Sequence, residues 1–161
     1  ETGDDLLLQK INKGETFASS LTALQSIKNA GMKSSVMILN GLGGSRYSEQ
    51  HAINSALLMN QAQPDYLATL VVSFYQGETR FQQAFGGDFE ALQPLQLFAE
   101  MQLLMQTLEL QKTIFRSDHA SNYLVLKGVL GRDREKLLTQ IEQAIQQHPS
   151  IQLREEWQRS L

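Results

Sequence analysis

The sequence contains no cysteine, and this absence restricts the chemistry of the chain more than any other feature. Without thiols the chain forms no disulfide, and no zinc or iron–sulfur site ligated by cysteine can lie within it. Its three histidines, His51, His119 and His148, are far apart in sequence and form neither an HxH nor an HExxH pair. The residues therefore predict no metal site in this chain.

Long apolar runs and an excess of positive charge are also missing. The longest mainly apolar segments, such as Val36–Leu39 and Leu67–Val72, are far shorter than a bilayer requires. The formal net charge is −3, and no cluster of Lys and Arg offsets it, which argues against nucleic-acid binding through bulk positive charge. We expect a cytoplasmic protein with neither a membrane nor a nucleic-acid partner.

What the chain does contain is enough apolar material for one core. It has 161 residues, of which 42% are hydrophobic and 19% charged, so we expect a single domain. The first residues, Glu1-Thr2-Gly3, include no initiator Met and lead directly into a helical pattern. We expect the start to be a cut within a larger protein, with a vector-derived leader as the alternative.

The periodicity of apolar residues predicts alternating strands and helices. Strands are expected over 34–40, 66–74 and 112–116. Helices are expected over 6–11, 16–30, 48–61, from Pro94 to about Leu108, over 133–147, and in a short tail around Trp157. Strands that alternate with helices favour a right-handed α/β series with a parallel sheet. Three strands are too few for a closed eight-stranded barrel, so we predict a partial TIM-like barrel, with βα units over about 1–131 and additional C-terminal helices over 132–161.

Candidate functional residues follow the strands of this prediction. The carboxyl ends of parallel strands carry the reactive face of a βα barrel, so segments 1–5, 40–46, 74–78 and 117–123 should converge. In the last of them, Asp118 beside His119 suggests a proton relay, while a loop that satisfies its own backbone is the alternative. The Gly41–Gly44 segment indicates either close approach to a ligand or a tight turn. Both His51 and His148 are expected at the surface.

Several stretches resemble the second half of radical S-adenosylmethionine proteins. The segment ETGDDLLLQKINKGET is similar to the one that leaves the fourth barrel strand, and AGMKSSVMILNGLGGSRYSEQHA looks like the fifth strand and its loop. The stretch PDYLATLVVSF is similar to the sixth strand. The long stretch FRSDHASNYLVLKGVLGRDREKLL resembles the tail of a branch of iron–sulfur oxidoreductases of unknown substrate. The resemblance covers nearly the whole chain.

The resemblance implies a cofactor and roles for individual residues. S-adenosylmethionine would be held by Glu1 through its ribose hydroxyls or amino group and by Lys13 through its carboxylate. Its adenine would lie against Leu39, Asn40 and Gly41, with further contacts from Phe74 and Tyr75. The substrate-facing residues would be Ser117, Asp118, His119 and Asn122. No catalytic residue is expected in this chain itself.

The resemblance also implies parts that this chain lacks. The CxxxCxxC motif is absent, so a [4Fe–4S] cluster would be bound only by a missing N-terminal half, and the complete enzyme would need an electron donor. The Gly-Thr-Pro that often follows the sixth strand reads Gly77-Glu78-Thr79. A stand-alone half-barrel that binds a nucleotide or a partner without catalysis is the alternative. A half-barrel leaves a strand edge unpaired, so we expect self-association.

Overall fold

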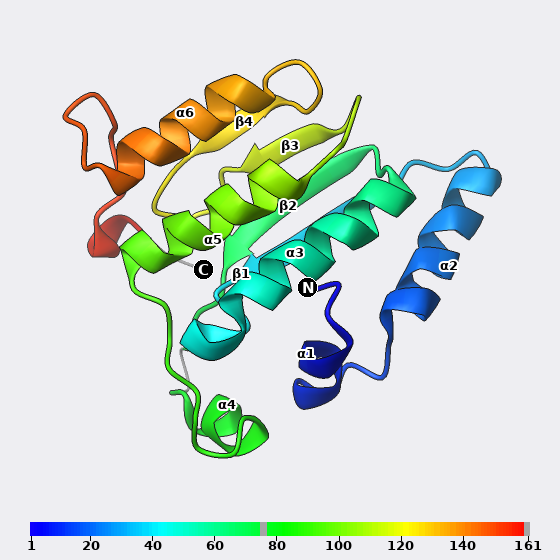
Figure 1. Cartoon of the computed structure of the whole chain (residues 1–161), viewed down its shortest axis with the longest axis horizontal. Coiled ribbons are helices and arrows are strands. Elements are labelled where there is room, and N and C mark those ends of the chain that lie inside the picture. Colours follow the sequence, from blue (N-terminus) through cyan, green and yellow to red (C-terminus); the bar gives the residue numbers. More distant parts are fainter. Residues whose placement is uncertain (75–76, 160–161) are drawn as a thin grey trace.

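The computed structural model describes residues 1–74 and 77–159 and has an α/β fold around an open sheet (Figure 1). The four strands are β1 (Ser35–Asn40), β2 (Tyr66–Val71), β3 (Ile114–Ser117) and β4 (Leu126–Val129), and they lie side by side in that order. The first three strands are parallel, whereas β4 pairs with β3 in the antiparallel direction. The described sheet is thus mixed, mostly parallel, and not closed into a barrel.

The described residues also form six α-helices and one 3₁₀ helix. They are α1 (Asp5–Lys10), α2 (Phe17–Asn29), α3 (Gly44–Ala62), α4 (Thr79–Ala84), α5 (Pro94–Thr107), α6 (Arg134–Ile145) and η1 (Glu156–Gln158). Local chemistry explains several of their ends. Thr16 caps α2 in a capping box, and Pro94 occupies the first turn of α5, where its missing N–H costs nothing. None of the described helices is long and apolar enough to cross a membrane.

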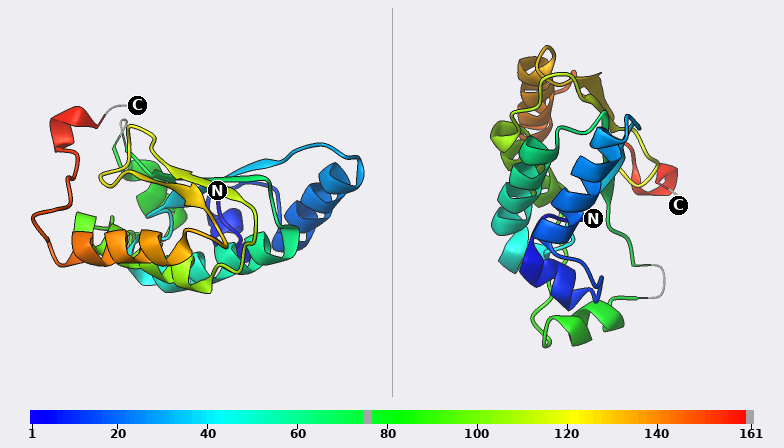
Figure 2. Two further views of the ribbon diagram at one scale, coloured as in Figure 1. Left: turned by 90° about the horizontal axis from the view of Figure 1, so that it is seen from above. Right: turned by 90° about the vertical axis from the view of Figure 1, so that its right-hand side faces the viewer.

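One face of the sheet is covered and the other is not. Helices α3, α5 and α6 pack on one face, whereas none of the described helices crosses the opposite face of β1–β3 (Figures 1 and 2). Strand alternation explains this division, because successive side chains point to opposite faces. Ile38, Leu67 and Phe115 are buried under the helices, whereas Met37 on the open face is 55% exposed.

The structure confirms most of the predicted elements and corrects others. All three predicted strands are present, although β2 ends at Val71 rather than Phe74. The expectation of parallel strands fails at β4, which lies in a stretch predicted to be irregular and is held by its pairing with β3. Helix α4 was not predicted. Helix α3 begins at Gly44 rather than at the predicted Ser48, whose hydroxyl donates to Glu100 and does not cap the helix.

The three parallel strands place their last residues at one edge of the sheet, which we call the carboxyl edge. Asn40 pairs in register with Val71, and Ser117 ends β3 at the same edge. The first residues of the chain reach this edge too, since the Leu39 N–H donates a hydrogen bond to the Glu1 carbonyl at 2.9 Å. This backbone hydrogen bond holds the beginning of the chain beside the end of β1.

Candidate functional site

A pocket of about 370 Å³ lies at the carboxyl edge, beside the end of β1. Its apolar floor is formed by Leu39, Leu42 and Val72. Residues 10–13 at the end of α1 form one wall, and residues 80–84 of α4 form another. Glu1 lies at its rim. The pocket therefore combines an apolar surface with ionisable groups, which is the usual composition of a small-molecule site.

Most of the charge around this pocket is positive. The Lys13 ammonium forms an ion pair with the Glu1 carboxylate at 2.5 Å. Lys10 and Arg80 also line the pocket, and neither forms an ion pair with any residue that the structure describes. Three cations and one carboxylate give the lining a net positive charge, which favours a ligand with an anionic group.

Helix α4 is attached to α1 through Leu7 of α1, which packs against an aromatic cluster that we define as Tyr47, Phe74, Phe81, Phe85 and Phe89. The ring centroids of its neighbouring pairs lie between 4.9 and 6.1 Å apart. The Lys10 ammonium lies 5.0 Å from the centre of the Phe85 ring, so it contributes a cation–π contact to this attachment. The cluster therefore sets the distance between the two walls of the pocket.

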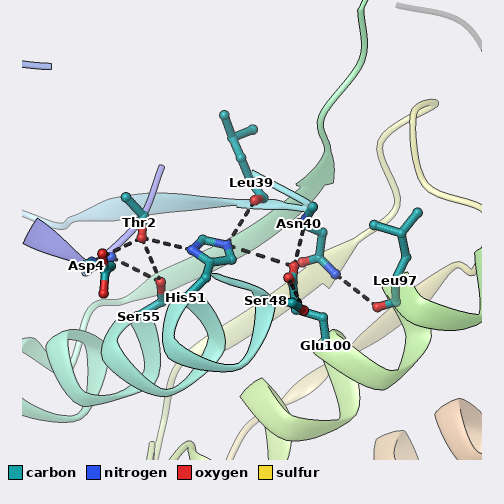
Figure 3. Close-up of polar contacts among 11 residues, drawn as sticks. Thr2, Asp4, Leu39, Asn40, Ser48, His51, Ser55, Leu97 and Glu100 are labelled. Carbon is teal, nitrogen blue, oxygen red and sulfur yellow. Dashed lines mark hydrogen bonds and ion pairs between the residues drawn. The ribbon is translucent and has the colours of Figure 1, made fainter. Parts of the chain in front are cut away.

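Behind the floor of the pocket lies a buried polar network (Figure 3). His51 on α3 is 1% exposed, and both its ring nitrogens have partners. Nδ1 lies 2.8 Å from the Thr2 hydroxyl, and Nε2 lies 3.0 Å from the Leu39 carbonyl. The prediction that His51 lies at the surface is wrong, because the chain segment at Thr2 and the end of β1 both fold against it.

Glu100 on α5 forms the second part of this network. Its Oε1 accepts a hydrogen bond from the Gly41 N–H at 2.7 Å, and its Oε2 accepts one from the Ser48 hydroxyl at 2.6 Å. The carboxylate also lies 3.9 Å from His51 Nε2. One side chain of α5 thereby fixes the turn between β1 and α3.

Burial dominates the acid–base properties of this network. It raises the pKa of Glu100 to about 7 and lowers the pKa of His51 to about 4, since water no longer solvates either charged form. His51 is therefore neutral at physiological pH. With Glu100 4% exposed as well, the pair is withdrawn from any substrate, and the arrangement fits positioning better than proton transfer.

The predicted cofactor residues fall into two groups. Glu1, Lys13 and Leu39 line the pocket together. Asn40 does not, because its amide donates a hydrogen bond to the Leu97 carbonyl on the helix-covered face.

Gly41 lies behind the pocket rather than in its wall. Its N–H is used by Glu100, and an added Cβ would meet Leu97 at 3.0 Å and Val72 at 3.3 Å. Phe74 belongs to the aromatic cluster, and Tyr75 lies outside the described residues.

The predicted substrate-facing residues also fall into two groups, one buried and one at the surface. Ser117 and Asn122 are each 2% exposed, and the Asn122 amide donates to the Thr69 carbonyl at 2.8 Å. Asp118 lies between Lys127 at 2.9 Å and Arg116 at 3.4 Å, and the hydrogen bond from Lys127 lowers its pKa.

The proposed relay between Asp118 and His119 has no support in the geometry. His119 Nδ1 lies 3.0 Å from the Ser121 hydroxyl, and in the described residues no hydrogen bond joins it to Asp118. The Arg154 guanidinium donates to the carbonyls of Asp118, His119 and Asn122, so the C-terminal tail holds this loop in place. The alternative, a loop whose own side chains satisfy its backbone, is seen in the described residues only where the Ser121 N–H donates to His119 Nδ1.

Sequence reasoning missed His51, Glu100, Thr2 and Arg80. Glu100 gave a usable signal, because it lies three residues after Leu97 and four before Leu104 on the apolar stripe of α5. A carboxylate on the core face of a helix requires buried partners. His51 carried a weaker signal, and Arg80 carried none.

In the part of the chain that the structure describes, no three His, Asp or Glu side chains are close enough to hold a metal ion. No protein-family model matches the chain, and no curated protein and no solved structure matches it significantly. The function must therefore be argued from the pocket and the fold.

Proposed function

We propose that the chain is the C-terminal part of a radical S-adenosylmethionine barrel and binds S-adenosylmethionine in the pocket at the carboxyl edge. The observation that carries this proposal is that three residues expected to contact the cofactor, Glu1, Lys13 and Leu39, line one pocket. They come from three separate segments, which are joined by the hydrogen bond from the Leu39 N–H to the Glu1 carbonyl and by the ion pair between Lys13 and Glu1.

The chemistry of the pocket fits the cofactor. Leu39, Leu42 and Val72 offer an apolar surface for the adenine, and the Lys13 ammonium can pair with the methionine carboxylate. The Glu1 carboxylate can accept hydrogen bonds from ribose hydroxyls. With no cysteine, this chain cannot hold the [4Fe–4S] cluster, whose electron would cleave the cofactor to a 5′-deoxyadenosyl radical. The part of these residues is to bind and orient S-adenosylmethionine.

The edge of β1 supports the partial-barrel prediction. A groove of about 450 Å³ runs along this edge and is lined by Met37, by Leu24 of α2 and by Leu58 of α3. Helix α2 has no fully buried residue and stands to one side of the other helices (Figure 1). The groove matches the space that a further barrel strand would fill.

The open edge also underlies our proposal that the isolated chain self-associates. Light scattering should show a dimer or larger species, and Met37→Glu should shift it toward the monomer, because a charge in the groove opposes apolar contact. A wild-type chain that stays monomeric at high concentration would contradict this proposal. A cytoplasmic location and a need for an electron donor belong to the same proposed function.

A second candidate, a nucleotide-binding half-barrel without catalysis, is favoured by the charge of the pocket. Its lining carries three cations and one carboxylate. At neutral pH S-adenosylmethionine carries a sulfonium and an ammonium against a single carboxylate, whereas ATP is strongly anionic. Electrostatics alone would thus favour ATP.

Calorimetry with S-adenosylmethionine and with ATP separates the two candidates. We expect S-adenosylmethionine to bind, and Lys13→Met to weaken it by about tenfold, the equivalent of one charge-assisted hydrogen bond. Lys28→Met is the matched control, because Lys28 lines a pocket at the opposite edge of the sheet. Binding of ATP without S-adenosylmethionine would overturn the first candidate. So would a parent reading frame without CxxxCxxC upstream of this segment.

A further inference from the structure

His51 lies at the junction of the two chain segments that form the rim and the floor of the pocket. It projects from α3 between the first residues of the chain and the end of β1 (Figure 3). The hydrogen bond between His51 and Thr2 holds the residue next to Glu1. The hydrogen bond between His51 and Leu39 holds a residue of the pocket floor. No other described side chain hydrogen-bonds to both segments.

The chemistry of the partners fixes the tautomer of the ring. The Leu39 carbonyl only accepts hydrogen bonds, so Nε2 carries the proton and donates it. Nδ1 is then the acceptor in the neutral ring and receives the Thr2 hydroxyl proton. The Thr2 oxygen in turn accepts the Asp4 N–H at 3.0 Å. A neutral imidazole thus satisfies both segments at once.

These contacts close a ring of interactions around the rim. Thr2 is bonded covalently to Glu1, the Glu1 carbonyl accepts the Leu39 N–H, and the Leu39 carbonyl accepts from His51. We propose that His51 is a positioning residue, which sets the spacing between Glu1 and Leu39 and thereby the width of the ligand pocket. As far as it concerns ligand binding, this inference rests on the proposed function.

The surroundings leave His51 few alternatives. Glu100 Oε1 is 3.9 Å from Nε2, beyond hydrogen-bond distance, and it already accepts the Gly41 N–H. The Ser55 hydroxyl accepts the Gly3 N–H at 3.0 Å and so supports the same segment from the next turn of α3. Substitution of His51 would leave the Leu39 carbonyl without its side-chain donor, and as a donor the Thr2 hydroxyl would keep only the long contact to the Ser55 hydroxyl at 3.5 Å.

A first experiment measures positioning without any ligand. In His51→Ala, amide hydrogen exchange at Leu39 should accelerate by about tenfold or more relative to Val72, whose N–H donates to the Asn40 carbonyl. Thr2→Val removes the Nδ1 partner and the acceptor of the Asp4 N–H, but it leaves the hydrogen bond from His51 to the Leu39 carbonyl, so it should give a smaller acceleration. His51→Gln keeps an amide donor and acceptor and should restore part of the protection.

The matched control is Thr113→Val. The Thr113 hydroxyl is also buried and donates to the Pro64 carbonyl at 2.6 Å, but it lies at the opposite edge of the sheet. It should lower stability without a selective change at Leu39. If His51→Ala fails to fold, Thr2→Val against Thr113→Val makes the same comparison. Equal exchange at Leu39 in the wild type and in the Thr2 and His51 variants would overturn the proposal.

A second experiment measures the dissociation constant for S-adenosylmethionine under conditions in which every variant is folded. We expect His51→Ala to weaken binding by about tenfold, His51→Gln to recover most of it, and Thr113→Val to leave it unchanged. An unchanged dissociation constant in His51→Ala would overturn the role in ligand binding. If the wild type binds neither S-adenosylmethionine nor ATP, the proposed function fails, while the exchange at Leu39 still decides the positioning role.

Discussion

Two polar clusters lie at the carboxyl edge of the sheet, and they differ in how much water reaches them. The network at the end of β1, around His51 and Glu100, is almost fully buried. At the loop after β3, the Asp118 side chain is 32% exposed and each of its two cationic partners is 55% exposed. Burial makes each hydrogen bond of the first cluster hard to replace, because water cannot substitute for a lost partner.

The comparison separates residues whose hydrogen bonds fix the local geometry from residues whose lost partners can be replaced by water. At the end of β1, two buried side chains supply the hydrogen bonds: Glu100 accepts from Gly41 and Ser48, and His51 donates to the Leu39 carbonyl. In the loop after β3, the backbone is held mainly by the Arg154 guanidinium, and the charged side chains are solvated. The end of β1 should therefore be the more rigid part of the edge, which is what a preformed ligand pocket needs.

The largest effect is expected when the buried carboxylate is removed. Glu100→Ala leaves the Gly41 N–H and the Ser48 hydroxyl without their partner and should lower the free energy of unfolding by about 2–3 kcal/mol. Urea unfolding measures the change. Glu100→Gln is the control, because its amide can accept from Gly41 and donate to Ser48, and it should cost less than about 1 kcal/mol. Equal losses in both variants would show that the hydrogen bonds are not what Glu100 contributes.

The pH dependence of stability should separate the two members of the buried network. Glu100 has a folded-state pKa of about 7 against an ordinary value of 4.5, so the folded state binds more protons and its contribution falls as pH rises between these values. His51, with a folded-state pKa of about 4 against 6.5, binds fewer protons when folded. Its contribution therefore rises with pH over that range.

Between about pH 4.5 and 6.5, the contributions of Glu100 and His51 to the free energy of unfolding change with pH in opposite directions. Single substitutions should separate the two contributions. Relative to the wild type, Glu100→Gln should gain stability with rising pH and His51→Gln should lose it, each by at most about 1.4 kcal/mol per pH unit. Urea unfolding across this range measures both profiles. Parallel profiles for the wild type and both variants would mean that neither group titrates as its burial requires.

The buried part of the loop after β3 should show an intermediate effect. Asn122→Ala removes the hydrogen bond to the Thr69 carbonyl and should cost about 1–2 kcal/mol in urea unfolding. Asn122→Asp is a useful companion, since it keeps the shape but places a carboxylate against a carbonyl oxygen. It should destabilise at least as much, and a smaller loss would indicate that water reaches this site.

Most of the fold follows from local patterns, but β4 does not. Strands β1 and β2 are mainly apolar, and Thr16 and Pro94 mark the starts of α2 and α5. Strand β4, Leu126–Val129, contains only four residues, among them Lys127 and Gly128, and carries little strand signal of its own. Its pairing with β3 supplies the hydrogen bonds that make it a strand.

The candidate site was predictable only in part, for a related reason. Alternation along β1 requires Leu39 and Asn40 to face opposite sides, so both side chains could not line one pocket. The convergence of Glu1 and Leu39 followed from the expected parallel strands. The buried contacts of His51 depend on how α3 lies against the first residues of the chain, and no short sequence pattern encodes that packing.

The smallest effect is expected in the exposed part of the loop after β3. Asp118→Asn weakens ion pairs with Lys127 and Arg116 that solvent already screens, so it should change the free energy of unfolding by less than about 0.5 kcal/mol. The loss should shrink further in high salt, whereas the loss in Glu100→Ala should not, because water and ions do not reach that carboxylate. A loss above about 2 kcal/mol in Asp118→Asn would erase the contrast between the two clusters. It would then place the loop after β3, rather than the end of β1, at the structural centre of the carboxyl edge.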